Sequence, residues 1–426
     1  MAVLKNQHLG VFDVIFTTAQ LIHFRIVSFI QRVGMPTFPQ TSLDWTKKLI
    51  GFDTTSRYSN LELIDYIKAY LSQCGVECFL VFNEDGKKAN LFATIPSATG
   101  EALEGGLVLS GHTDVVPVDG QAWDSEPFVA QEDKGRLYGR GACDMKGFIG
   151  TVLALVPEFA KTRLKAPLHL AFSFDEEIGC LGAPIMLKEL AQKGIKPAGC
   201  IVGEPTSMRP VVAHKGISAY KCVVHGCAAH SSLTPLGTNA IEYAARIICM
   251  FRDLTDEIKQ KGPFDAYFDV PFTTGQTSTI QGGNAINTVP AYCEFLFEYR
   301  TLPAQSPTEI LERIEAYINE VLVPKMKKEN AVAGIELIKL ANAPGMETAE
   351  KEAIMQLVRG LTKESDIAKV AYATEGGLFQ QAGIPTVICG PGSIEQAHKA
   401  NEYIALEQLA KCEAFLRSVC ASQQVE

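Results

Sequence analysis

The sequence predicts an α/β protein in which a mixed sheet carries helices on both faces and a smaller α+β unit is inserted into the chain. Between residues 76 and 203, short apolar runs typical of buried strands alternate with segments of helical periodicity. After residue 213 the pattern changes to alternating polar and apolar residues, which is typical of half-buried antiparallel strands. Several apolar runs end directly before acidic residues or a histidine, and in such sheets ligands bind at the carboxyl ends of strands.

The first half of the chain supplies most of the predicted large sheet. Two amphipathic helices are expected within residues 42–74, with apolar positions at Leu43, Trp45, Leu49, Leu61, Ile64, Ile67 and Leu71. Gly75 is expected to end the second helix as a C-terminal cap. Strands are predicted at 76–82, 90–95, 107–110, 167–174 and 199–203, and helices at 147–160 and 182–193.

The second half contains the predicted insertion. Strands at 217–225 and 291–300 alternate with helices at 238–259 and 306–322, and the α/β rhythm resumes from about residue 333 with a late strand at 385–389. We therefore expect an N-terminal extension at 1–40, a catalytic domain in two parts at 41–213 and 331–426, and an inserted lid at 214–330.

Composition narrows the class of protein. A chain of 426 residues with 47% hydrophobic residues is expected to form more than one domain with a sizeable core. The net charge of −9 argues against a nucleic-acid partner, because nucleic-acid-binding proteins present a basic surface. The 12 cysteines are scattered without zinc-ribbon spacing, which favours free thiols and a reducing, cytoplasmic location.

The N-terminal extension is apolar but matches no standard targeting segment. Asp13, His23 and Arg25 interrupt the apolar run at 9–30, whereas a membrane-spanning helix needs about 20 mostly apolar residues. A signal peptide needs an uninterrupted apolar region and a small-residue cleavage site. We favour a poorly packed extension or a product of upstream translation for residues 1–34, with no membrane partner; a peripheral membrane anchor is the alternative.

Two candidate site residues follow the strand at 107–110. His112 and Asp114 are two positions apart, so in an extended segment both side chains point the same way, and the carboxylate can orient the imidazole or bind a metal directly.

Asp144 lies between glycines in GACDMKG, where a bridging carboxylate between two cations would justify a strained backbone. An ordinary turn aspartate is the alternative for Asp144.

Further acids and one histidine follow later strands. Glu176 and Glu177 are adjacent acids whose mutual repulsion a cation would remove. Because neighbours on a strand point in opposite directions, one of them can bind a metal while the other faces the substrate. Five residues suffice to bind two zinc ions through one shared carboxylate, namely His112, Asp144, Glu177, Glu204 and His398. This leaves Glu176 beside the metals as a base. His230 is either a surface histidine or a donor to a developing oxyanion, and His169 is expected in the core.

The joint order of these motifs resembles the di-zinc aminoacylase/carboxypeptidase family of peptidases and deacylases. The matching motifs are SGHTDVVP at 110–117, LYGRGACDMKG at 137–147, DEEIG at 175–179, GEPTSMRPVVAHKG at 203–216, ATEGGLFQ at 373–380 and CGPGSIEQAHKANEYI at 389–404. The resemblance covers the chain from about residue 42 onward. Within the family, EPTS, TEGG and GPGSIEQAH are most similar to the branch that deacetylates N2-acetyl-L-ornithine in arginine biosynthesis. Cys143 departs from the usual motif without affecting a catalytic position.

The resemblance implies a role for each candidate residue. One zinc would be held by His112 and Glu204 and the other by Glu177 and His398, with Asp144 bridging them and cobalt as a substitute metal. Asp114 would support His112, Glu176 would act as the base, and His230 would steady the oxyanion from the partner subunit of a homodimer formed through the insert. A small-molecule N-acyl amino acid would be held by Asn287, Arg300 and Glu375. The Asp144–Met145 peptide is expected to be cis.

Other activities remain open at this point. The nearest alternatives are another N-acyl amino acid deacylase, such as a succinyl-diaminopimelate desuccinylase or an aminoacylase, and a dipeptidase of the same family. A metal-binding scaffold without catalysis belongs to a different class. The presence of Glu176 beside all five candidate ligands argues against that class, because a scaffold has no use for a base.

Removing residues 1–34 is expected to leave folding and activity nearly intact, because every candidate site residue lies beyond Asp44. Solubility, the thermal unfolding midpoint and turnover of the truncated chain should be compared with those of the full chain. An insoluble or inactive truncated chain would show that the extension is part of the fold.

Overall fold

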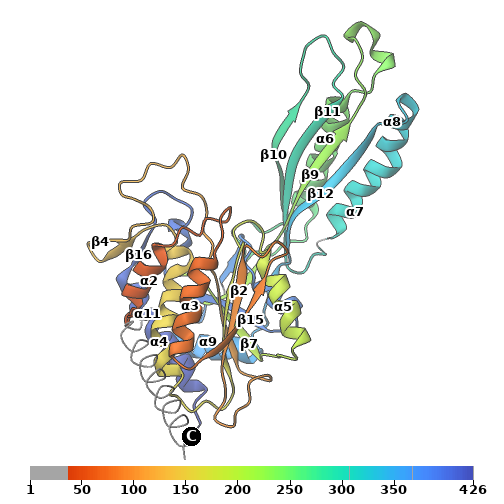
Figure 1. Ribbon diagram of the computed structural model, residues 1–426. Coiled ribbons are helices and arrows are strands. Elements are labelled where there is room, and N and C mark those ends of the chain that lie inside the picture. The colour runs from red at the N-terminus through yellow and green to blue at the C-terminus, as the bar shows by residue number, and fades with distance from the viewer. Residues whose placement is uncertain (1–36, 307, 367, 426) are drawn as a thin grey trace, which may run out of the picture. The chain divides into compact units, whose positions relative to one another are not determined.

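A computed structural model describes residues 37–306, 308–366 and 368–425, which form three sheets with helices packed on them (Figure 1). The expected extension at 1–34, and both hypotheses about it, lie outside these residues. Within the described part of the chain, no helix is long and apolar enough to cross a membrane. All 12 cysteines fall in this part and are free thiols, as the sequence predicts.

The large sheet is mixed, as expected, and its middle is parallel. Its strand order is β1 (Glu77–Phe82), β2 (Ala89–Ile95), β6 (Leu168–Ser173), β3 (Leu107–His112), β7 (Gly199–Pro205), β15 (Thr386–Gly390), β8 (Val211–His214) and β13 (Met346–Glu347), and β14 (Ala368–Val370) also pairs with β8. The neighbours β6, β3, β7 and β15 all run parallel. Their carboxyl ends therefore meet at one edge of the sheet.

Helices cover both faces of the large sheet, which parallel strands require because they are buried on both sides (Figure 1). On one face lie α3 (Leu61–Gln73), α4 (Gly147–Phe159) and α9 (Ala353–Thr362), with α2 (Ser42–Ile50) and α11 (Leu406–Ser422) packed outside them. On the other face lie α5 (Gly182–Gln192) and α10 (Gly376–Gln381). The approach of α4 to β7 is close enough that a Cβ at Gly203 would lie 2.1 Å from the ring of Phe148.

A separate antiparallel sheet forms the core of the α+β unit (Figure 1). Its strand order is β10 (Thr274–Gly282), β11 (Tyr292–Thr301), β9 (Gly216–His225) and β12 (Gly334–Ala343). The helices α6 (Ala240–Lys261), α7 (Thr308–Ala316) and α8 (Val323–Glu329) supply the side chains that pack against it. Because β12 pairs with β9, this sheet extends past residue 330, and the large sheet resumes only at β13. We propose that the inserted unit spans 216–343.

The alternation of residues in β11 sets the two faces of the small sheet. Cys293, Phe295, Phe297 and Tyr299 are buried against the helices. The intervening side chains are only half-buried and face the opposite side, and Arg300 is among them. This places a charged side chain on the open face of the sheet.

A third, short sheet joins segments that are far apart in the sequence. It consists of β4 (Gln131–Asp133), β5 (Arg136–Tyr138) and β16 (Tyr403–Ala405), all antiparallel. It brings the GRGACD segment beside the segment that follows His398, because β5 directly precedes the former and β16 directly follows the latter.

Candidate metal centre

The carboxyl ends of the parallel strands carry most of the candidate metal ligands. His112 is the last residue of β3, and Glu204 lies at the end of β7. Glu177 follows β6 and His398 follows β15. Asp144 comes from the loop that leads into α4. Because β6, β3, β7 and β15 are neighbours, the five side chains gather at one place although they are spread over almost three hundred positions.

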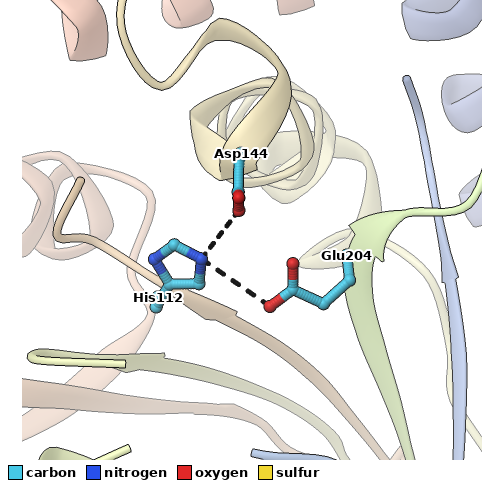
Figure 2. Close-up of side chains that lie close together, drawn as sticks. All are labelled: His112, Asp144 and Glu204. Carbon is cyan, nitrogen blue, oxygen red and sulfur yellow. Dashed lines mark hydrogen bonds and ion pairs between the residues drawn. The ribbon is translucent and has the colours of Figure 1, made fainter. Parts of the chain in front are cut away.

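The five side chains form two groups that share Asp144. In the first, His112 Nε2 lies 3.0 Å from Asp144 Oδ1 and 3.6 Å from Glu204 Oε1 (Figure 2). In the second, His398 Nε2 lies 3.0 Å from Glu177 Oε2 and 3.3 Å from Asp144 Oδ2. The ligand atoms of each group lie within 4.8 Å of one another. Asp144 therefore presents one oxygen to each group, the arrangement of a bridging carboxylate.

The tautomer of His112 is set by its own strand end. Its Nδ1 lies 2.9 Å from the backbone carbonyl oxygen of Asp114, which can only accept, so Nδ1 carries a proton and Nε2 is the nitrogen that faces Asp144 and Glu204. The Asp114 carboxylate accepts hydrogen bonds from Ser56 Oγ at 2.6 Å and from the backbone N–H groups of Glu176 at 3.0 Å and Glu177 at 3.3 Å. Asp114 thus links the end of β3 to the turn that carries the adjacent acids.

The backbone takes uncommon conformations at these strand ends. Asp175 and His398 have φ values of 55° and 62°, in the left-handed region that non-glycine residues rarely adopt. Such strain costs on the order of 1–3 kcal/mol per residue and persists only where the surroundings enforce it. The Asp144–Met145 peptide is cis, as the resemblance implied.

The electrostatics of the cluster favour a cation. Burial, together with nearby negative charges, raises the pKa of Glu176 to about 8 and that of Glu177 to about 7. Burial raises the pKa of Glu204 well above its usual range for the same reason. Burial acts on Asp144 in the same direction, but hydrogen bonds from His112 and His398 outweigh it and lower the pKa of Asp144. Hydrogen bonds to Asp144 and Glu177 raise the pKa of His398 to about 10.

The donor set fits divalent metal ions. Glu177 Oε1 and Glu204 Oε1 are buried and have no hydrogen-bond partner among the described residues. Unpaired buried carboxylate oxygens are costly unless a cation takes their lone pairs. Imidazole nitrogens combined with carboxylate oxygens are typical ligands of zinc and of neighbouring transition metals.

A cavity of about 320 Å³ opens beside the two groups. Glu176 lines it but belongs to neither candidate metal group. The small sheet contributes Ile217 and Arg300 to its lining, and the guanidinium of Arg300 donates to Glu298 at 3.2 Å. Tyr372 and Ile394 also line it. Neither of these last two residues was predicted as a site residue, because only the packing of distant segments brings them to the cavity.

Five predicted site residues are not among those that line this cavity, namely His112 and Asp114, which lie at the end of β3, and Glu375, His230 and Asn287. Glu375 is buried behind the strands, where its two oxygens accept hydrogen bonds from Ser110 Oγ at 2.6 Å and Ser173 Oγ at 2.7 Å, so it is not placed to pair with a substrate ammonium. His230 and Asn287 are exposed on two adjoining loops, and Ser231 N donates to Asn287 O at 3.0 Å. His169 is a core residue, as expected, beside Thr94 Oγ1 at 2.9 Å.

Comparison with known protein sequences points to one family. The model of peptidase family M20/M25/M40 matches residues 108–422. An acetylornithine deacetylase from Pasteurella multocida (strain Pm70) is 35% identical over 88% of this chain and 94% of its own. An acetylornithine deacetylase from Myxococcus xanthus is 36% identical over 88% of this chain and 95% of its own.

Solved structures agree on the fold. The M20 family metallo-carboxypeptidase from Sulfolobus solfataricus superposes with a TM-score of 0.69 at 19% identity, covering 89% of this chain and 98% of its own. A dinuclear metal-binding peptidase of the M20 family from Bacillus subtilis superposes with a TM-score of 0.62 at 15% identity, covering 89% and 97%. At these identities the likeness concerns the fold alone.

Metal binding is expected to displace protons from the centre. In the metal-free protein Glu176, Glu177 and His398 have pKa values of about 8, 7 and 10, so each holds a proton over much of the neutral range. A cation favours the deprotonated forms, so zinc affinity should rise as the pH increases from about 6 to about 8. Competition titrations against a chelator of known affinity at several pH values measure this, and a pH-independent affinity would contradict it.

Proposed function

The chain belongs to peptidase family M20/M25/M40, a family of hydrolases, and from this premise we propose that it hydrolyses N2-acetyl-L-ornithine to L-ornithine and acetate. The observation that carries the proposal is the pair of histidine–carboxylate groups that share Asp144, with Glu176 beside them but in neither group. The relatives at 35% and 36% identity support the substrate.

Two zinc ions, with cobalt as a substitute, are the proposed cofactors. His112 and Glu204 would hold one ion, Glu177 and His398 the other, and Asp144 both, which matches the two groups of ligand atoms. Such ions polarise a carbonyl oxygen and lower the pKa of water, which makes a nucleophile available at neutral pH.

Glu176 is the proposed general base. Its carboxyl group lies at the cavity and, unlike that of Glu177, is not committed to a candidate metal group. Burial raises its pKa, and a base whose pKa lies near the operating pH transfers protons most efficiently. Glu176 would accept the proton of the attacking water and then donate it to the leaving amine nitrogen.

Arg300 is the proposed anchor of the substrate α-carboxylate. It extends from the open face of the small sheet to the cavity, and a guanidinium can grip a carboxylate with two parallel hydrogen bonds. Its present partner, Glu298, is an acidic side chain two positions away on the same strand, so a substrate carboxylate would replace one anion with another.

We propose further that the protein is a homodimer in which His230 and Asn287 serve the partner's cavity. Both residues lie on exposed loops that meet through a β-bridge between His230 and Thr288. Large apolar side chains are exposed on the same loops, namely Leu233, Leu236 and the fully exposed Ile286. Exposed apolar patches of this kind mark protein interaction sites, so a second subunit that covers these loops would explain both features.

A panel of substrates tests the proposed activity. Purified protein should release amine fastest from N2-acetyl-L-ornithine, compared with other N-acetyl amino acids, N-succinyl-diaminopimelate and dipeptides. The Glu176→Gln variant is the matched control for contaminating hydrolases. Preference for a succinylated substrate or a dipeptide would favour the corresponding alternative within the family. No hydrolysis of any of them by metal-loaded protein would favour a metal-binding scaffold.

The adjacent acids are expected to respond differently to the same substitution. Glu176→Gln keeps the size of the side chain but cannot accept a proton, so turnover should fall by roughly 100- to 10,000-fold while both metals stay bound. Glu177→Gln should weaken one metal, because a neutral amide is a poor zinc ligand, and excess metal should partly restore its activity. Metal content and turnover measure both effects. Rescue of Glu176→Gln by metal would mean that the roles are reversed.

His230→Ala is expected to lower turnover by roughly 100- to 1000-fold, the cost of one lost oxyanion donor, without changing the metal content. Mixing this variant with Glu176→Gln should restore activity if His230 acts across a dimer, because one site of each mixed dimer would then be intact. Unchanged turnover in His230→Ala would remove this residue from the mechanism. No recovery on mixing would leave His230 acting within its own chain.

A further inference from the structure

We propose that Glu402 and Arg140 are positioning residues that hold the backbone of Asp144 and of His398. They thereby set the affinity of the centre for the second metal ion, by which we mean the ion that the second group, Asp144, Glu177 and His398, would hold. The inference rests on the proposed metal centre and deepens it. Neither residue lines the cavity or belongs to a candidate metal group. Both side chains are only 1% exposed and form a buried ion pair, with Arg140 Nη1 at 2.8 Å from Glu402 Oε2.

The Glu402 carboxylate organises the loop that carries Asp144. Its Oε1 accepts from the backbone N–H groups of Cys143 at 2.8 Å and Asp144 at 3.0 Å. Its Oε2 accepts from the N–H of Gly141 at 2.9 Å, as well as from Arg140. Gly141 has a φ of 81°, which lets the loop curl around the carboxylate. One side chain, 258 positions away in sequence, therefore fixes the backbone of the shared ligand.

Arg140 extends the same network to the loop of His398. Its Nη1 also donates to the carbonyl oxygen of Lys399 at 3.3 Å, and its Nη2 donates to Gln121 Oε1 at 2.5 Å. Gln121 Nε2 in turn donates to the carbonyl oxygen of His398 at 2.9 Å. A continuous chain of hydrogen bonds thus runs from the N–H of Asp144 to the carbonyl of His398.

The two metal groups differ in how much they need this network. His112 and Glu204 lie on strands of the large sheet, where ladder hydrogen bonds already fix the backbone. Asp144 and His398 lie on loops, and the His398 side chain is 55% exposed with its backbone in the left-handed region. Glu177 also lies on a loop, the one after β6, so all three ligands of the second group lie outside the strands and loosening the network should weaken the second ion more than the first.

Stability alone is a poor explanation for the buried ion pair. The cost of removing two charges from water often offsets their attraction, and an apolar pair of similar volume can be equally stable. An apolar pair, however, cannot accept the three backbone N–H groups that Glu402 holds. Hydrogen-bond partners that orient metal ligands typically change metal affinity by about 10- to 100-fold when they are removed.

Zinc affinity of three full-length variants tests the proposal. Gln121→Ala cuts the link to His398 and leaves the Glu402–Arg140 pair in place. Gln380→Ala is its matched control, because Gln380 is also half-buried and also donates to a backbone carbonyl, that of Glu347 at 2.7 Å, but lies outside the network. The double variant Arg140→Met with Glu402→Gln removes both buried charges together, so neither is left unpaired. Zinc-loaded protein is equilibrated at graded free zinc concentrations and the bound zinc per chain is measured.

Gln121→Ala is expected to bind the second zinc about 10- to 100-fold more weakly and the first as tightly as wild type. Gln380→Ala should match wild type for both ions. The double variant should bind the second zinc weakly at temperatures where circular dichroism shows an intact fold, and if it unfolds, Gln121→Ala still decides the question. Equal second-zinc affinities in Gln121→Ala and Gln380→Ala would overturn the proposal. A wild-type chain that binds fewer than two zinc ions would instead overturn the proposed metal centre, and this inference with it.

Discussion

The parallel alignment of β6, β3, β7 and β15 is the constraint on which the site depends. Side chains alternate along a strand, so a shift of one residue between β3 and β6 would turn His112 away from Asp144. The buried carboxylate of Glu375 stabilises this register, because it accepts hydrogen bonds from Ser110 on β3 and from Ser173 on β6. The residue expected to contact substrate thus ties together the two strands beneath the metal ligands.

The three adjacent acids after β6 illustrate how the fold separates identical chemical groups. Asp175 lies 2.5 Å from Lys88 Nζ, which gives it a cation supplied by the protein. Glu177 lies beside His398 in a candidate metal group, and Glu176 lines the cavity and forms no ion pair with any residue that the structure describes. Burial is the largest cause that raises the pKa of Glu176 to about 8, and the nearby carboxylates of Glu177 and Asp144 act in the same direction.

Local patterns predicted β1, β2, β3, β6, β7 and β15 of the large sheet, and the candidate ligands that follow four of them, because both depend on short runs of sequence. The features that were missed depend on contacts between distant segments. No strand was predicted at 334–343, a range expected to belong to the catalytic domain, but β12 lies there and pairs with β9 more than a hundred positions earlier. The charge of Glu375 suggested a substrate contact, and only the packing of β3 and β6 around it shows that it is buried. The pairing of Arg140 with Glu402 likewise spans 262 positions.

The proposed roles place hydrolysis on the large sheet and substrate recognition on the small sheet. The groups proposed to hold metal and to move protons all come from the large sheet and its loops, whereas Arg300 and Ile217 reach the cavity from the small sheet. Substitutions on the open face of the small sheet can therefore change which substrate is held without disturbing the ligand geometry. The proposed separation would allow one scaffold to serve both peptidases and deacylases. The family match identifies a hydrolase, whereas the fold alone does not set the substrate, which under these proposed roles depends on the few side chains that the small sheet presents.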